Sequence, residues 1–356
     1  MPNLEEQVNE LKDAGYPVRK GIRQFSEESG RDVADNIWLH RWAKHAAQNY
    51  PIVTRSAGVR FLENAAKGVP AFVIGIGPSL DNNIAKLKGL DGRALIFATD
   101  AAYRPLLANG IIPDLVMTYD CQSAQKNLFD HSYCEDPPAL LCNSCSHPDT
   151  ISAWEGPILF YNQWHTKDVF IEFLLPYIFP LIGQIPSSGT VGNMLVNVAY
   201  ILGCNPIFTV GMDLCYAKHG EGWRYRCQDY KYGKIDDSGQ GGWIKNDNLI
   251  LYDNDDRVRS SFDEEINGEK FRVDAELKTY REALIGLCRG LGIKIIDCSV
   301  DGILRMYFRT ISVEQAALEF CTYKMMEGRT VVPHLSKIIP DGRKIWEEQR
   351  KNGWVC

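Results

Sequence analysis

From Ala71 onward, the sequence alternates short runs of apolar residues with longer stretches that have helical spacing. Strands that are apolar throughout, rather than alternately apolar and polar, are typical of a parallel sheet covered on both faces. The pattern therefore predicts an α/β, Rossmann-like fold with a mainly parallel sheet and helices on both faces. Strands are expected at 71–76, 93–99, 113–119, 138–144, 157–163, 206–212 and 293–299, with helices between them, among others at 80–88, 101–109, 190–203 and 274–291.

The rest of the chain is organised around this core. Residues 1–67 have helical patterns and are expected to form a helical N-terminal segment, residues 68–305 the α/β domain, and residues 306–356 a helical C-terminal extension. Residues 217–272 interrupt the alternation of strands and helices with an irregular insert rich in glycine and aromatic residues. Such an insert is typical of a lid or substrate-binding flap, and a hairpin that only covers an edge is the alternative.

Charge and composition exclude several classes of function. A net charge of −6 over 356 residues gives no general attraction to nucleic acid or to an anionic membrane. No apolar stretch is long enough for a membrane span, and the polar first residues predict a cytoplasmic protein. The cysteines are scattered, with a single CxxC at Cys142 and Cys145, so reduced thiols and no metal site are expected.

Small and polar residues follow the predicted strands. In parallel sheets the carboxyl ends of the strands share one edge, where ligands bind at a switch point of the strand order. Three of these ends carry an aspartate, namely Asp100, Asp120 and Asp213. We expect these carboxylates to lie at the same edge as Gly77, although polar residues are also ordinary in loops after strands.

The stretch FVIGIGPSLD joins the first strand to a helix. It is not a GxGxxG fingerprint, because Leu80 stands where the third glycine belongs, and no GK[ST] follows as in a P-loop. Gly75, Gly77, Pro78 and Ser79 are instead candidates for a phosphate-binding turn at a helix N-terminus, and a tight strand–helix turn is the alternative. If the turn binds phosphate, Gly77→Val should abolish nucleotide binding and leave the fold largely intact.

A second turn of small residues precedes a later helix. Ser187, Ser188 and Gly189 stand immediately before the helix that begins near Thr190. Ser188 or Thr190 can serve simply as an N-cap, but two such helix starts at one sheet edge make a better anion site than either alone.

Both blocks together, GIGPSL with the two strands after it and SSGTVGNMLVNVAYILGCNPIFTVGMDLCY, resemble the MptE-like family. That family includes archaeal 6-hydroxymethylpterin diphosphokinase and bacterial motility-associated factors that glycosylate flagellin with nonulosonic acids. The blocks are also similar to bacterial sialyltransferases of the GxGPSL type, which use CMP-sialic acid. The resemblance covers roughly residues 70–305 and implies a nucleotide-binding transferase domain.

The chain departs from both branches at their catalytic residues. In the diphosphokinase branch the resemblance implies a DxD pair that holds magnesium on ATP, but here the place reads Thr118-Tyr119-Asp120. In the sialyltransferase branch it implies a histidine base shortly before the helix that begins near Asp274, where this chain has none. His219 is the nearest candidate base, and Glu264, Glu265 and Glu269 are others.

The resemblance implies a transferase that uses a nucleotide-activated donor, most simply a CMP-linked sugar of the nonulosonic-acid type. Asp100 and Asp120 would then orient ribose, sugar or acceptor, with His219 as the candidate base. The acceptor is a small molecule, a glycan or a protein. The alternatives are ATP- and Mg²⁺-dependent diphosphate transfer to a 6-hydroxymethylpterin-like substrate, and a nucleotide-binding protein without catalysis.

Overall fold

A computed structural model describes residues 30–119, 121, 128–129, 137–164, 174–219, 222–227 and 260–322, with the backbone alone for 30–40, 219 and 222. The described α-helices are α2 (Gly30–Val53), α3 (Leu80–Asn83), α4 (Asp100–Ala108), α5 (Pro148–Ser152), α6 (Leu175–Ile178), α7 (Val191–Ile201), α9 (Ala275–Leu291) and α10 (Val313–Phe320). Short 3₁₀ helices lie at Val59–Leu62, Ile84–Leu90 and Ile303–Met306.

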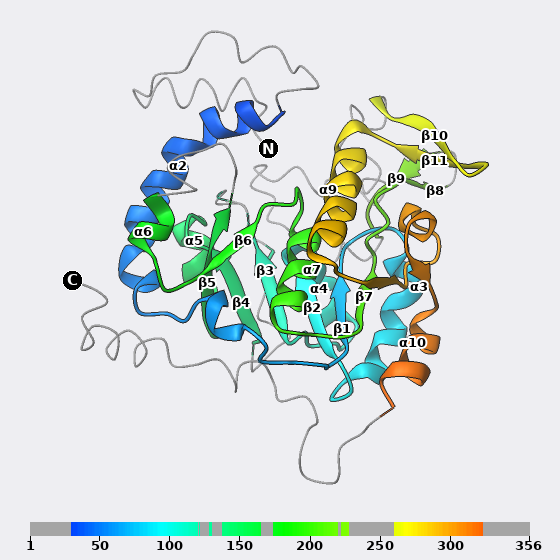
Figure 1. Cartoon of the computed structure of the whole chain (residues 1–356), viewed down its shortest axis with the longest axis horizontal. Helices are drawn as coiled ribbons and strands as arrows, with labels where there is room; N and C mark the ends of the chain where they lie inside the picture. The colour runs from blue at the N-terminus through cyan, green and yellow to red at the C-terminus, as the bar shows by residue number, and fades with distance from the viewer. Residues whose placement is uncertain are drawn as a thin grey trace.

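Within the described residues, nine strands form one sheet in the order β13-β12-β7-β1-β2-β3-β4-β5-β6, and every neighbouring pair is parallel (Figure 1). This confirms the predicted Rossmann-like α/β fold. The strands are β1 (Ala71–Ile74), β2 (Leu95–Thr99), β3 (Leu115–Thr118), β4 (Ala139–Asn143), β5 (Ile158–Trp164), β6 (Gln184–Pro186), β7 (Ile207–Val210), β12 (Ile295–Asp297) and β13 (Arg309–Thr310).

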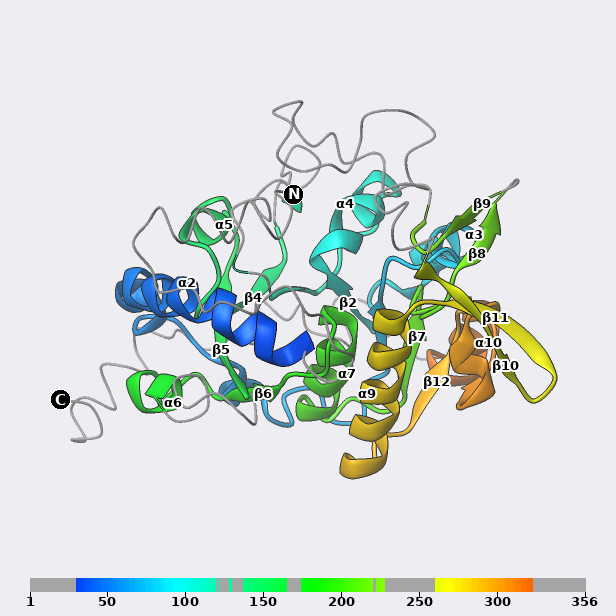
Figure 2. The ribbon, with the colours of Figure 1, turned by 90° about the horizontal axis from the view of Figure 1, so that it is seen from above.

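Helices cover both faces of the sheet, as Figure 2 shows, because the central strands are apolar on both sides. On the face that we call the α4 face, alternate strand residues such as Phe72 and Val116 pack against α2, α3, α4, α5 and α10. On the opposite face, the α7 face, residues such as Val73 and Phe97 pack against α7 and α9. The core therefore consists of two apolar layers separated by the sheet.

Several strands were not predicted from the sequence. β6 has only three residues and ends in Pro186, so it gives little strand signal. The insert contributes two antiparallel hairpins, β8 (Ala217–His219) with β9 (Gly222–Arg224) and β10 (Phe262–Ile266) with β11 (Glu269–Val273). The turn of the second hairpin is Asn267-Gly268, and both residues have positive φ, as this common hairpin dipeptide requires.

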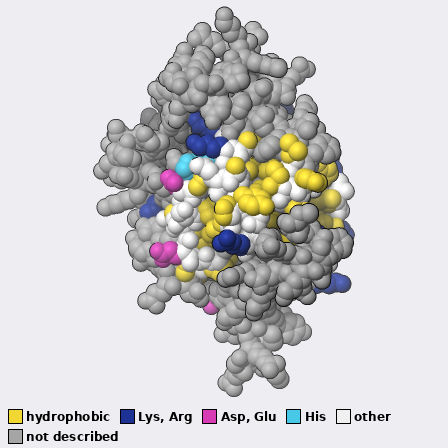
Figure 3. All heavy atoms as spheres, turned by 90° about the vertical axis from the view of Figure 1, so that its left-hand side faces the viewer, with side chains coloured by type: hydrophobic (Ala, Val, Ile, Leu, Met, Phe, Trp, Pro, Cys, Tyr) yellow, Lys and Arg dark blue, Asp and Glu magenta, His cyan; other side chains and the backbone are white. Residues whose placement is uncertain are grey.

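The outer surface carries an apolar patch on the side of the β6 edge. Figure 3 views this side, and its hydrophobic side chains gather over the region of α2 and α6 in Figure 1. The exposed large apolar residues there include Tyr50, Trp164, Leu174 and Tyr177. None of the described helices is long and apolar enough to cross a membrane.

Candidate functional site

The switch point of the sheet lies between β1 and β7. Strands β1 to β6 follow one another in one direction, and the chain then returns so that β7 pairs with the other side of β1. In open α/β sheets, ligands bind outside the carboxyl ends of the strands at such a point. The residues after β1 and β7 are Gly75 to Ser79 and Gly211 to Asp213, so this part of the predicted site stands at the expected place.

The glycines after β1 allow close contact with the loop after β7. The Gly77 N–H donates to the Gly211 carbonyl at 2.6 Å, and a Cβ on Gly75 would lie 2.5 Å from that same oxygen. A Cβ on Gly77 would overlap Asp213 Oδ2. Neither Gly75 nor Gly77 has positive φ. The contact between the two loops therefore explains both glycines without any ligand.

Asp213 also occupies the start of α3. Its Oδ2 accepts hydrogen bonds from the Ser79 N–H at 3.1 Å and from the Ser79 hydroxyl at 3.0 Å. These are the donors that the phosphate interpretation assigned to a ligand, and Pro78 between Gly77 and Ser79 is buried. Burial raises the pKa of Asp213 to about 7, and the nearby carboxylates of Asp297 and Asp301 also raise it. The two hydrogen bonds from Ser79 lower the pKa but do not offset the effect of burial.

Asp213→Asn should remove a pH-dependent loss of stability. Because the folded-state pKa is raised from 3.8 to about 7, the stability contributed by protonated Asp213 is complete below pH 4 and is lost as the pH rises to 7. Asparagine can still accept both Ser79 hydrogen bonds. The free energy of unfolding of the variant should exceed that of the parent by about 4 kcal/mol at pH 8 and match it near pH 4. Urea titrations at both pH values check this, and an equal difference at the two values would contradict it.

Asp100 is held on the α4 face of the sheet. Its Oδ2 accepts the Thr118 hydroxyl at 2.8 Å, and its Oδ1 accepts the N–H of Ala101. Thr118 stands at the place where the resemblance implies the first aspartate of a DxD pair, and its hydroxyl is bonded to Asp100 instead. Asp120 lies outside the described residues, and its predicted role stays a prediction.

The N-terminus of α7 is built from the other predicted turn. Thr190 caps the helix by accepting the Asn193 N–H, and Asn193 Nδ2 donates to the Ser188 carbonyl at 2.6 Å and the Tyr280 carbonyl at 2.8 Å. Gly189 has a φ of +87°, and a Cβ there would lie 2.7 Å from Tyr280 Cδ1. Ser187 is half-buried, whereas the Ser188 hydroxyl is buried without a hydrogen-bond partner. This helix start, unlike that of α3, keeps a free polar group.

The two predicted turns approach each other through Met212. A Cβ on Gly75 would lie 2.9 Å from Met212 Cγ, and a Cβ on Gly192 would lie 3.2 Å from Met212 Cε. The loop after β1, the loop after β7 and the first turn of α7 therefore pack together at the carboxyl edge. Sequence reasoning omitted Met212 and Asn193, since neither residue type marks a site by itself.

The insert begins directly above the β1 turn. Arg224 of β9 forms an ion pair with Asp81 of α3 at 2.6 Å, and the Cys227 N–H donates to the Ile76 carbonyl. His219 lies in β8, and its side chain is outside the described set. The insert is thus attached to the candidate site, as a lid or flap would be.

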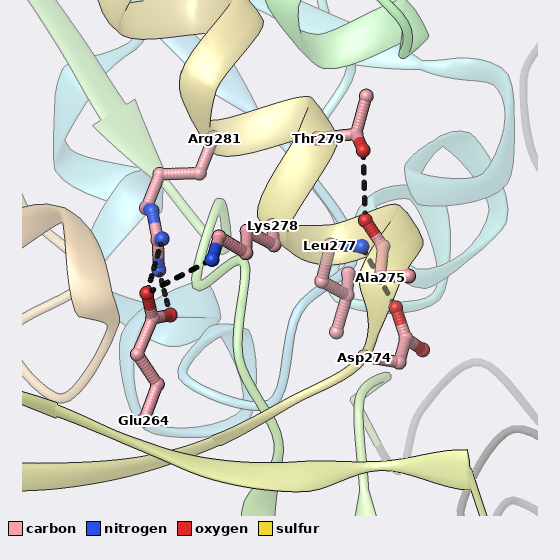
Figure 4. Close-up of polar contacts among 7 residues, drawn as sticks. All are labelled: Glu264, Asp274, Ala275, Leu277, Lys278, Thr279 and Arg281. Atoms are coloured by element: carbon pink, nitrogen blue, oxygen red, sulfur yellow. Dashed lines mark hydrogen bonds and ion pairs between the residues drawn. The ribbon is translucent and has the colours of Figure 1, made fainter. Parts of the chain in front are cut away.

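Glu264 is unsuited to the role of general base. Figure 4 shows it on β10, where both carboxylate oxygens accept from Arg281 of α9 at 2.8 and 3.0 Å. Hydrogen bonds from Arg281 hold its pKa below the usual range, so it does not readily take up a proton. Asp274, also in Figure 4, caps α9 by accepting the Leu277 N–H, and its other oxygen accepts from Tyr216. Glu265 is exposed, and Glu269 pairs with Arg305.

A hollow of about 700 Å³ lies at the opposite edge of the sheet. Its lining includes Arg60, Gln184, Asn205 and Lys294, which stand near the amino ends of β6, β7 and β12. Ligands of open α/β sheets bind at the carboxyl ends, so we place the candidate site there and not in this hollow.

The sheet order and the polar groups at its carboxyl edge define a doubly wound, Rossmann-like α/β protein. Residues 44–219 match the family model described as MptE-like: 6-hydroxymethylpterin diphosphokinase MptE-like. The resemblance to the MptE-like family is therefore confirmed over a region that runs from α2 to β8 and includes both turns of the site. No curated protein matches the chain.

The solved structures that are similar to the chain include two transferases. The first is the MAf glycosyltransferase from Magnetospirillum magneticum AMB-1, with a TM-score of 0.57 and 19% identity. The match covers 90% of this chain and 46% of that one, so this chain spans about half the length of that protein. The second is the sialyltransferase CstII from Campylobacter jejuni in complex with the substrate analogue CMP-3FNeuAc. Its identity to this chain is 14% and the TM-score is 0.32, and the match covers 80% of this chain and 99% of that one. The first likeness concerns the fold alone.

Proposed function

We propose that the chain is a transferase that uses a nucleotide-activated donor and transfers a sugar from a CMP-linked nonulosonic acid or similar compound. The observation that carries this proposal is the free, buried Ser188 hydroxyl before α7, next to the switch point. An 11-residue helix has unpaired N–H groups and a positive dipole end at its start, which favour phosphate. The fold shared with a glycosyltransferase supports sugar transfer over other uses of a nucleotide.

The phosphate is proposed to contact Ser187, Ser188 and Gly189 rather than Ser79. The Ser79 donors already bind the Asp213 carboxylate, and a phosphate beside that carboxylate would be repelled whenever Asp213 is ionised. Gly75, Gly77 and Pro78 would then form the floor beneath the ligand, with Asp213 as the residue that shapes it.

Two serine variants test this assignment. Ser188→Ala should leave the melting temperature unchanged and weaken CMP binding about tenfold, since a hydrogen bond to a charged group contributes about 1.5–3 kcal/mol. Ser79→Ala should do the reverse, because its hydroxyl bonds to Asp213 and not to the ligand. Calorimetric titration of CMP into both variants, with melting curves, measures the two effects. A larger loss of CMP affinity in Ser79→Ala would contradict the assignment.

Diphosphate transfer to a pterin-like alcohol is the second candidate, because the matching family model is named for a 6-hydroxymethylpterin diphosphokinase. Thermal-shift measurements with CMP, UMP, and ATP with and without Mg²⁺ separate the two. A nucleotide at 100 times its dissociation constant stabilises the folded state by about 2.7 kcal/mol. We expect CMP to give the largest shift, whereas a shift with ATP that requires Mg²⁺ would favour the diphosphokinase. CMP binding without turnover of any CMP-sugar would indicate a non-catalytic nucleotide-binding protein.

A further inference from the structure

Two buried amide side chains stand at the carboxyl ends of neighbouring strands β4 and β5. Asn143 is 3% exposed and Gln163 is 1% exposed. Side chains alternate along a strand, and Leu141 and Tyr161, two residues earlier, belong to the apolar layer of the α7 face. Both amides therefore lie on the α7 face, the face on which α7 and its N-terminal turn pack.

Backbone contacts fix the orientation of both amides. The Cys145 N–H donates to Asn143 Oδ1 at 2.9 Å, so the Asn143 Nδ2 must point away from that backbone group. Nδ2 then donates to Gln163 Oε1 at 3.4 Å. Gln163 Nε2, at the end of these two hydrogen bonds, is buried and has no hydrogen-bond partner. Reversing either amide would place two donors or two acceptors against each other.

The fold itself gains nothing from Gln163 Nε2. A buried donor without a partner destabilises the folded state, and each such group in a native structure calls for a cause. Asn162, the adjacent residue, shows the contrast. Its Oδ1 accepts from the Ser144 hydroxyl, and its Nδ2 donates to the carbonyl of Phe179 at 3.1 Å. One buried amide at the end of β5 is thus satisfied by the protein, and the next is not.

Neighbouring strand ends present further free polar groups. The hydroxyl of Thr99, at the end of β2 on the α7 face, is buried without a partner, as is that of Ser188 after β6. The Ser187 N–H donates to the Trp164 carbonyl, which places the turn before α7 beside the end of β5. The Gln163 amide and the Thr99 hydroxyl are uncharged groups that suit the hydroxyl and carbonyl oxygens of a sugar, whereas Ser188 belongs to the proposed phosphate site.

We propose that Asn143 and Gln163 form a binding subsite for the hydroxyl or carbonyl oxygens of a sugar. Strands are spaced by about 4.8 Å, so β4 lies roughly 14 Å from β1 along the sheet edge. The subsite thus serves the part of the reactants beyond the nucleotide, either the sugar of the donor or an acceptor sugar. This inference rests on the proposed function for its place in the reaction, but the binding of sugar can be tested separately.

The test compares Gln163→Met with Asn162→Ala. Gln163→Met keeps the shape and removes the unpaired donor, but it also removes the acceptor of Asn143 Nδ2. One unpaired buried donor replaces another, so the melting temperature should stay near that of the parent, and the affinity for sugar should fall at least tenfold. Asn162→Ala should lower the melting temperature and keep the parental affinity. The probes are CMP, CMP-N-acetylneuraminic acid, and free N-acetylneuraminic acid, N-acetylglucosamine and lactose, measured by calorimetry and saturation-transfer NMR.

The pattern of losses identifies the source of the sugar. A loss confined to CMP-N-acetylneuraminic acid, with CMP unchanged, assigns the subsite to the donor sugar, and a loss with a free sugar assigns it to the acceptor. A parent that binds a free sugar through Gln163 but binds neither CMP nor ATP would contradict the proposed function and leave the subsite in place. The subsite is overturned if the parent binds none of the sugar probes, or if Gln163→Met binds them as the parent does.

Discussion

Gly77→Val should abolish folding, and Gly77→Ala should lower the free energy of unfolding by about 3 kcal/mol or more. A Cβ at this position would overlap Asp213 Oδ2 and lie 2.7 Å from the Gly211 carbonyl. Both neighbours belong to the loop after β7, and the backbone carbonyl cannot rotate away as a side chain can. Urea unfolding of the alanine variant measures the loss. The structure thus contradicts the expectation from sequence that valine would leave the fold largely intact.

Gly89→Ala is the matched control for this prediction. A Cβ on Gly89 would meet no atom within 4 Å, so its effect on stability should stay within about 0.5 kcal/mol. Gly77→Ala combined with Asp213→Ala should cost less than the sum of the two single variants, because one of the two overlaps disappears. Equal stability of Gly77→Ala and Gly89→Ala would show that the loop contact is not close.

Thr118→Asp should destabilise the protein by about 3–5 kcal/mol at pH 8 in the absence of divalent cations. The new carboxylate would face that of Asp100, which now accepts the Thr118 hydroxyl at 2.8 Å, and both positions are buried. Two adjacent carboxylates raise the pKa of one member, so the loss should be small at pH 4 and grow as the pH rises. Millimolar Mg²⁺ should restore part of the stability if the carboxylates of residues 100 and 118 bind the ion together.

Thr118→Asn controls for the size of the substituted side chain. Its amide can still donate to Asp100, so it should be far more stable than the aspartate variant at pH 8 and insensitive to Mg²⁺. Thermal melts of both variants between pH 4 and pH 8, with EDTA or with Mg²⁺, provide the comparison. Equal melting temperatures for the two variants at pH 8 in EDTA would show that Asp100 is not within reach of residue 118.

The central strands could be predicted from the sequence because strands buried on both faces consist of continuous runs of apolar residues. β1, β2, β3 and β4 are apolar over nearly all of their length and buried throughout, which no amphipathic helix would be. β6 and β13 have three and two residues, and their pairing depends on the sheet that they extend. The β10–β11 hairpin carried a readable signal in Asn267-Gly268, but its strands are mostly charged, and only Phe271 and Val273 of them are buried.

The site was harder to predict, because a residue type does not reveal its partner. A glycine after a strand permits close approach of any group, and here that group is the loop after β7 and not a ligand. Asp213 was correctly placed at the carboxyl edge, yet no neighbouring residue indicated that it would bind Ser79. The free donor of Gln163 follows from two hydrogen bonds, one from the Cys145 N–H to Asn143 and one from Asn143 to Gln163. Neither hydrogen bond can be predicted from the residue types.

The position of β1 in the sheet determines when its pairing can be completed. Its registered partner Ile207 follows Ala71 in the chain only after the whole of strands β2 to β6. Until β7 leaves the ribosome, β1 is therefore the outer strand of a half-formed sheet, with an unpaired edge and the apolar sequence AFVI. Such edges pair readily with other chains. Synthesis that pauses before residue 207 should thus yield an aggregation-prone intermediate, and only β12 and β13 remain to be added once β7 has closed the centre of the sheet.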